Sequence, residues 1–273
     1  MKRLLSIAVL AAAVVGAGLP VVLTTSTARA DEVAATALPA GKEVIERFIQ
    51  ATGGREAYAK FTSRTTKGTL DIPAQGMKAS LTIFQLAPDK GLVESEIPAL
   101  GVMKQGSDGE TAWSIDPMQG ARILSGGERD TLIRQFRFDG DSDWEKYYKS
   151  AETIGVEDVD GKPAYKVKLT PVGEGLADSV GYYDKESGLV VRMDTVMQSP
   201  MGELAVVSKI SNYKDFGGIK IPTTTVQEVA GMTMSMTVES VDHDTTLDEA
   251  KFALPADIEK LKAQQAPAAK PGE

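Results

Sequence analysis

Residues 219–241 read IKIPTTTVQEVAGMTMSMTVESV and carry the clearest secondary-structure signal in the chain. In the second half, Met232, Met234 and Met236 alternate with Thr and Ser. Successive side chains of a β-strand point to opposite faces, so this period of two predicts a strand with one apolar face. An Ala-Gly pair separates it from a preceding β-branched run. The stretch is therefore predicted to form two neighbouring strands.

The same period of two recurs along most of the chain. Such runs lie at residues 65–72, 77–86, 92–97, 111–115, 153–159, 164–169, 179–183, 189–197, 203–210, 219–229 and 232–241. Turn sequences such as Asp160-Gly161 separate them. About eleven or twelve strands in sequential order favour one large, strongly curved antiparallel sheet, closed or nearly closed. The predicted fold class is mainly β.

Helices are expected in three places. In residues 42–50, apolar residues gather on one helical face, and Gly53-Gly54 then ends the helix. Residues 125–148 break the β rhythm and are predicted to contain two helices. Residues 255–264 are predicted to form a short polar helix near the end of the chain.

The first thirty residues resemble a secretory signal peptide. Lys2 and Arg3 precede an apolar run that ends before an Ala-Arg-Ala cleavage site, which predicts cleavage after Ala30. An uncleaved membrane anchor is the alternative, and Gly16 and Gly18 within the run disfavour it. We expect a periplasmic protein with a flexible lead-in at 31–41, a domain at 42–257 and a polar, largely disordered tail at 258–273.

Charge and cysteine content exclude several kinds of partner and site. Of the 30 Lys and Arg residues, three lie in the first thirty positions, which leaves 27 against 38 Asp and Glu and a net charge of −11. A chain this acidic repels phosphate backbones, so nucleic acid is not an expected partner. The absence of cysteine excludes disulfides, thiolate metal sites and cysteine nucleophiles.

The sequence offers little for catalysis or for metal binding. His243 is the single histidine and lies between two aspartates, so it is expected to be a solvated loop residue. Residues 139–143 read DGDSD and resemble the start of a calcium loop, but Trp144 replaces the required glycine and Ser150 the required glutamate. Helix capping ahead of Trp144 is the preferred interpretation. No catalytic residue, metal site or cofactor is predicted.

Methionine is the most informative residue type. The candidate cavity-lining residues are Leu81, Ile83, Met193, Met197, Met232, Met234 and Met236, with Met77 and Met103 as further members of the set. Methionine is flexible and suits surfaces that accept variable apolar shapes. An ordinary sheet core covered by helices is the alternative, but a sheet of this size encloses more space than a few helices fill.

Four segments carry a family resemblance. They are Ala51-Thr52-Gly53-Gly54 with Lys60-Phe61, then residues 184–192 (DKESGLVVR), residues 213–222 (YKDFGGIKIP) and residues 247–255 (LDEAKFALP). These segments are similar to those of outer-membrane lipoprotein-sorting proteins of the LolA/LolB-like superfamily. The resemblance spans nearly the whole predicted mature chain, and its motifs mark turns and strand ends.

The resemblance implies an unclosed β half-barrel with helices packed on its concave side around an apolar cavity. It implies a soluble carrier or chaperone for lipids or for the acyl chains of lipoproteins, which are sorted toward the outer membrane. It also implies membrane-associated donor and acceptor proteins as partners, and no enzyme activity. A sensor or regulatory module that recognises lipidated or misfolded proteins without transport is the alternative.

Overall fold

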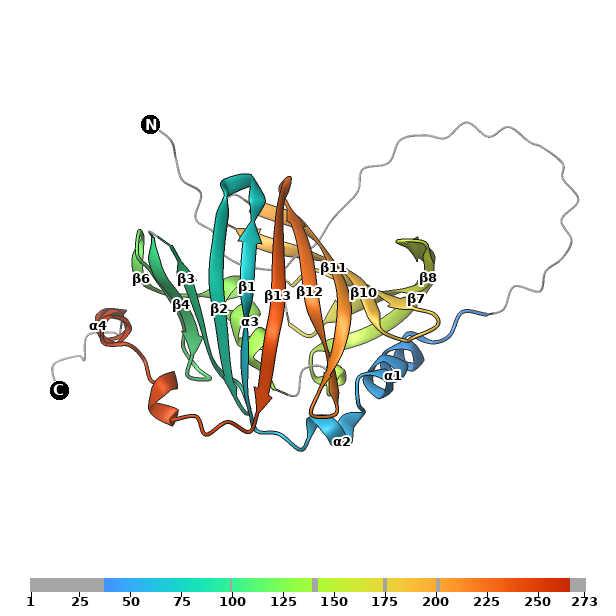
Figure 1. Ribbon diagram of the computed structural model, residues 1–273, viewed down its shortest axis with the longest axis horizontal. Helices are drawn as coiled ribbons and strands as arrows, with labels where there is room; N and C mark the ends of the chain where they lie inside the picture. The colour runs from blue at the N-terminus through green and yellow to red at the C-terminus, as the bar shows by residue number, and fades with distance from the viewer. Residues whose placement is uncertain (1–36, 99, 139–141, 174–175, 200–201, 266–273) are drawn as a thin grey trace, which may run out of the picture.

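The computed structural model describes residues 37–98, 100–138, 142–173, 176–199 and 202–265. Within these ranges, thirteen strands form one antiparallel sheet in the order β6-β5-β4-β3-β2-β1-β13-β12-β11-β10-β9-β8-β7 (Figure 1). The strands are β1 (Ser63–Ile72), β2 (Met77–Leu86), β3 (Lys90–Ile97), β4 (Gly101–Ser107), β5 (Ala112–Asp116), β6 (Gly120–Ile123), β7 (Tyr148–Val159), β8 (Lys162–Pro171), β9 (Ser179–Asp184), β10 (Val190–Ser199), β11 (Gly202–Phe216), β12 (Ile219–Val229) and β13 (Met232–His243). The predicted mainly β fold with a single curved, unclosed sheet is confirmed, because β6 and β7 form its two separate edges.

The strand order departs from a simple sequential meander. Strands β1 to β6 run outward to one edge, and β7 to β13 return from the opposite edge, so that β1 pairs with β13 in the middle of the sheet. Arg64 lies opposite His243 at one end of this pairing, and Asp71 lies opposite Ser235 at the other. The segment between β6 and β7 is too long for a hairpin, and it carries the chain from one sheet edge to the other.

Two strands were not predicted, β4 and β6. Strand β4 starts at Gly101 and contains Gly106 beside the ring of Trp113, so its apolar alternation is interrupted. Strand β6 has four residues, too few to show a period. Both strands pair because neighbouring strands supply their backbone partners.

Three helices lie on the concave side of the sheet: α1 (Gly41–Ala51), α2 (Arg55–Tyr58) and α3 (Gly126–Phe136). Helix α1 buries Ile45 and Ile49 in a core cluster with Val167 of β8. Its end is as predicted, since Thr52 forms the cap and Gly53 and the residue after it take positive φ.

Helix α3 lies across the other half of the concave face, behind β1 and β13 in Figure 1. Leu132 and Phe136 of this helix cluster with Ile83 and Val93 of the sheet. The approach depends on Gly91 of β3, where a Cβ atom would come within 2.0 Å of the Phe136 ring. The helix can therefore lie this close only because Gly91 has no side chain.

The last helix, α4 (Ala256–Gln265), packs on the convex face after a 3₁₀ turn, η3 (Glu249–Phe252). Ile258 is fully buried there in a cluster with Leu92 and Trp113. Leu92 precedes Val93 in β3 and faces the opposite side of the sheet. The helix agrees with the expectation for residues 255–264. The domain boundary expected at residue 257 therefore falls inside a packed helix.

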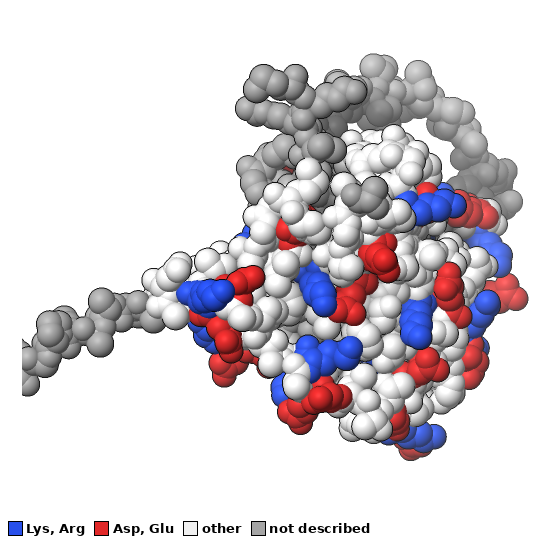
Figure 2. Space-filling view, turned by 60° about the vertical axis from the view of Figure 1, so that its left-hand side comes forward, with Lys and Arg blue, Asp and Glu red and all other residues white. Residues whose placement is uncertain are grey.

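Several sequence expectations lie outside the described residues. These are the signal peptide, its cleavage site, most of the lead-in and the last eight residues of the tail. Within the described ranges, no helix combines the length and hydropathy needed to cross a membrane. The outer surface seen in Figure 2 mixes acidic and basic side chains. One such pair, Glu94 and Lys104, joins neighbouring strands with a 2.6 Å ion pair.

Candidate functional site

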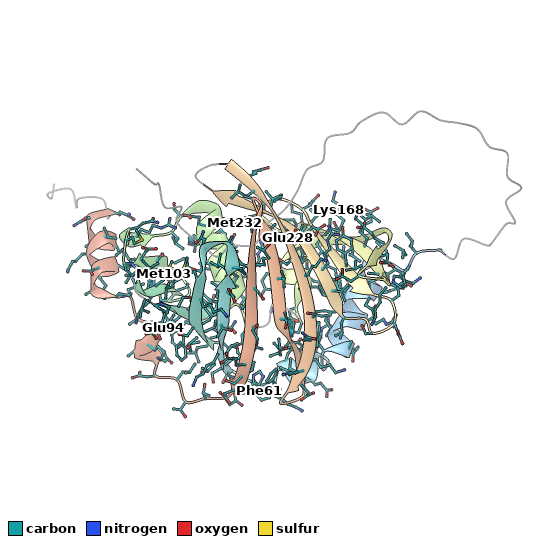
Figure 3. The ribbon with its side chains drawn as sticks, turned by 45° about the horizontal axis from the view of Figure 1, so that its top comes forward. Phe61, Glu94, Met103, Lys168, Glu228 and Met232 are labelled. Atoms are coloured by element: carbon teal, nitrogen blue, oxygen red, sulfur yellow. The ribbon has the colours of Figure 1, made fainter. Side chains whose placement is uncertain are left out.

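A cavity of about 300 Å³ lies on the concave face between β1–β4, β12–β13 and α3. Eleven apolar side chains line it: Leu70, Ile72, Met77, Ala79, Leu81, Ile83, Val93, Ile97, Met103, Met234 and Met236. Five uncharged polar side chains complete the lining: Ser95, Gln105, Gln135, Thr225 and Gln227. Figure 3 shows Met103 on the β3–β4 side of the sheet, away from the central strands.

The strand register explains why these residues share one face. Residues directly opposite each other in neighbouring antiparallel strands point the same way. Thr225 is opposite Met236, Met236 is opposite Leu70, and Leu70 is opposite Ala79. Ala79 precedes Leu81 and Ile83 at the same alternation along β2. The cavity wall is therefore a continuous belt of inward positions across six strands, β1–β4 and β12–β13.

Four of the predicted cavity residues line this cavity, namely Leu81, Ile83, Met234 and Met236. Met77 and Met103, which belonged to the wider methionine set, line it as well. Met234 is the most buried of the four, 7% exposed, and it also packs in a core cluster with Ile72 and Val206.

The other three predicted residues lie elsewhere. Met232 has the same orientation along β13 but lies at the strand end, where its sulfur is 3.7 Å from the amide nitrogen of Gln75. Met193 lines a second cavity. Met197 lies opposite Leu204 in the β10–β11 pairing, and its side chain is outside the described part of the structure.

Sequence reasoning missed most of the lining contributed by β1, β3 and β4. Leu70 and Ile72 alternate along β1, and Val93, Ser95 and Ile97 alternate along β3. These runs showed the signal for a strand, but nothing in them distinguished a cavity wall from a filled core. Gln135 was not predicted as a lining residue either, because only the placement of α3 over the sheet brings its side chain to the cavity.

The second cavity, about 270 Å³, lies on the other half of the concave face beneath α1. Its lining is richer in aromatic side chains than that of the first cavity, with Phe48, Tyr58, Trp144, Tyr148, Tyr183 and Tyr213. The guanidinium of Arg64 also reaches it, and lies 4.9 Å from the centre of the Phe138 ring. The linings of the two cavities are neighbours on the sheet, because Ile210 of the second lies opposite Thr225 of the first.

His243 is not the solvated loop residue expected from its acidic neighbours. Its ring stacks on Phe61 with centroids 4.1 Å apart, and both ring nitrogens are shielded from solvent. Burial lowers the pKa of the imidazole below its ordinary value, and Arg64 adds to that effect, although the Phe216 backbone opposes it. The expectation of a solvated ring was wrong because the residue that covers it, Phe61, is remote in sequence and its contact cannot be read from the neighbours of His243.

A 3₁₀ turn, η2 (Trp144–Lys146), begins at Trp144, where the capping interpretation expected a helix to start. Asp143 occupies the cap position, but its carboxylate contacts Lys146 at 2.7 Å and makes no capping hydrogen bond. Residues 139–141 of the calcium-like run are outside the described residues. In the part of the chain that the structure covers, no three His, Cys, Asp or Glu side chains gather as metal ligands.

Comparisons with known proteins agree on the fold alone. No family model matches the sequence, and no curated protein matches it either. A DUF1329 family protein from Desulfovibrio piger is 15% identical with a TM-score of 0.57, covering 79% of this chain and 98% of the other. An outer membrane lipoprotein-sorting protein domain from Vibrio parahaemolyticus is 17% identical with a TM-score of 0.53, covering 78% and 95%.

A LolA superfamily protein from Nitrosomonas europaea resembles this chain to a similar degree. It is 14% identical with a TM-score of 0.55, and the alignment covers 80% of this chain and 99% of that protein. At identities this low, the comparisons show a shared backbone fold and nothing more specific. That architecture is the unclosed antiparallel sheet with helices on its concave side. The chain therefore has a LolA-like fold.

Proposed function

We propose that the protein is a periplasmic carrier or chaperone that binds lipids or the acyl chains of lipoproteins for sorting toward the outer membrane. The observation that supports this proposal best is the concave cavity, which has eleven apolar lining residues and no charged one. Moving an acyl chain from water into such a cavity contributes about 0.8 kcal/mol per methylene. The cavity therefore suits hydrocarbon chains.

Two further observations support the proposed setting. The first thirty residues have the pattern of a cleaved signal peptide, which directs a bacterial protein out of the cytoplasm. Two structures of the same fold are a lipoprotein-sorting protein domain and a LolA superfamily protein. Under this proposal the partners are acyl chains together with membrane-associated proteins that donate and accept them.

Helix α3 is the element we propose to move when ligand enters and leaves. It packs on the cavity wall through Leu132 and Phe136, and Gln135 on the same helix lines the cavity while remaining exposed to solvent. Helix α3 takes no part in the strand pairing, so it can shift without breaking the sheet.

We propose binding and not catalysis as the activity. The side chains that face the cavity are aliphatic, thioether, amide and hydroxyl groups. A general acid or base needs an ionisable group within hydrogen-bond reach of the reacting atoms. The imidazole of His243 is instead stacked on Phe61 at the far end of β13.

The proposal is tested by filling the cavity. The purified protein should bind the apolar fluorescent probe N-phenyl-1-naphthylamine, and Leu81→Trp should weaken that binding strongly because the indole occupies the cavity. Ser80→Trp is the matched control, since Ser80 is the exposed neighbour on the opposite face of β2. A parent protein that does not bind the probe, or a Leu81→Trp variant that binds it normally, would contradict the proposal.

Transport is tested separately from binding. A labelled lipoprotein is presented in donor vesicles, and its arrival in acceptor vesicles is followed with and without the protein. A carrier accelerates the transfer, and Leu81→Trp abolishes the acceleration. Probe binding without accelerated transfer would instead support a sensor or regulatory module.

A further inference from the structure

We infer that the concave cavity takes a hydrocarbon chain whose link to the rest of the ligand is an uncharged hydrogen-bonding group, such as a hydroxyl, ester or amide. This inference rests on the proposed function and names the ligand class of the same site. It depends on two amide side chains near α3 and on the lack of charge in the cavity lining.

Two polar side chains lie at the α3 end of the cavity. Gln135 belongs to α3 itself, and Gln105 of β4 lies opposite Val93, which packs against α3. The other end, beside the β1–β2 connection, is formed by Ile72 and Met77, with Gln227 opposite Met234 next to them. A chain that lies along the apolar wall therefore meets the amides of Gln105 and Gln135 near α3.

Two of these polar groups have hydrogen-bonding capacity to spare. The side-chain amides of Gln105 and Gln135 make no hydrogen bond to any other described residue. Gln227 differs, because it donates to the Ser208 hydroxyl at 3.3 Å. An amide supplies both donors and an acceptor, so Gln105 and Gln135 can bind a carbonyl oxygen, a hydroxyl or an amide N–H of a ligand.

The absence of charge in the lining selects against ionic groups inside the cavity. A carboxylate or an ammonium moved out of water needs an opposite charge or several hydrogen bonds to offset its lost hydration. Neutral amides and hydroxyls supply only part of that. A neutral ester or hydroxyl loses far less on entry and gains the amide partners.

The test compares four competitors for bound N-phenyl-1-naphthylamine, each with one dodecanoyl or dodecyl chain. They are monolauroylglycerol, an N-lauroyl peptide amide, laurate at about pH 8 and dodecyltrimethylammonium. We expect the two neutral ligands to displace the probe at about tenfold lower concentration than the two ions. Preference for the peptide over the glyceride would identify a lipoprotein anchor as the source of the chain, and the reverse a free lipid.

Gln105→Leu tests the proposed polar contact. It should weaken monolauroylglycerol binding about threefold to tenfold, the effect of one lost hydrogen bond. Gln50→Leu, on the exposed face of α1, is the matched control and should bind monolauroylglycerol as the parent does. Equal displacement by all four competitors, or a Gln105→Leu variant that binds monolauroylglycerol normally, would overturn this inference while the proposed carrier stands. A parent protein that binds no probe would instead remove the proposed function.

Discussion

Met234 and Met236 are neighbours on one face of β13, yet they have different surroundings. Met234 is 7% exposed and packs against Ile72 and Val206, whereas Met236 is only half-buried at the cavity wall. Deleting a packed side chain loses its transfer free energy and leaves a new void. Deleting a side chain that already borders a void lowers the free energy of unfolding by less.

We therefore expect Met234→Ala to lower the free energy of unfolding by about 2–5 kcal/mol, and Met236→Ala by clearly less. Urea denaturation of both variants measures the difference. Probe binding should respond in the opposite order, because Met236→Ala reshapes the cavity while the fold is kept. Equal destabilisation by the two substitutions would show that Met236 lies in a filled core.

The single histidine makes a pH prediction unusually direct. Burial holds the pKa of His243 below its ordinary value of 6.5 in the folded protein. As pH falls through that value the unfolded chain gains a proton that the folded chain does not, so stability present above about pH 6.5 is lost on acidification. Urea unfolding at about pH 7.5 and about pH 5.5 should show this loss.

His243→Phe provides the control for that prediction. A phenyl ring preserves the stack on Phe61 and removes the titrating group. The variant should lose the pH dependence between these two conditions and keep its stability at the higher pH. A parent protein equally stable at both pH values would contradict the buried assignment of the ring.

At the scale of elements, the contact between α3 and β3 is the most sensitive to a small change. A Cβ atom at position 91 would lie 2.0 Å from the Phe136 ring, so Gly91→Ala must displace α3 or strain the strand. We expect a loss of about 1–3 kcal/mol, with faster probe exchange because α3 no longer seats on the cavity. Gly155→Ala in β7 is the matched control, since its added Cβ meets no atom within 4 Å. A Gly91→Ala protein with the stability of the control would show that α3 does not depend on this contact.

At the scale of the whole molecule, the sheet joins the two halves of the chain through β1 and β13. The concave side holds α1, α2, α3 and both cavities, and the convex side holds α4. The predicted carrier function needs only the concave side. The buried Ile258 on α4 stabilises the opposite face and stands apart from the ligand.

The export of the molecule is a prediction from its first residues. The intact mass of protein recovered from the periplasm should correspond to a chain beginning at Asp31. Ala30→Trp should block cleavage, because the site requires a small residue, and should leave the longer form in the membrane fraction. Recovery of residues 1–30 on the unaltered protein would instead support a membrane anchor.

The sequence by itself determined the mainly β class, nearly all strand positions, the end of α1 and the apolar alternation of β13. These features follow from local rules, because side-chain alternation and glycine turns act within a few residues. Met234 and Met236 could be assigned to one face for the same reason. The likeness of short motifs to the LolA/LolB-like superfamily also anticipated the unclosed sheet.

Only the tertiary structure decided which alternating residues line a void and which fill a core. Met193, Met232 and Met236 have the same sequence pattern, yet they lie in a second cavity, at a strand end and in the main cavity. The difference depends on strand register and on where α1 and α3 cross the sheet. The stack of His243 on Phe61 likewise depends on pairing between the first and last strands, which joins residues too far apart in the chain for any local pattern to relate them.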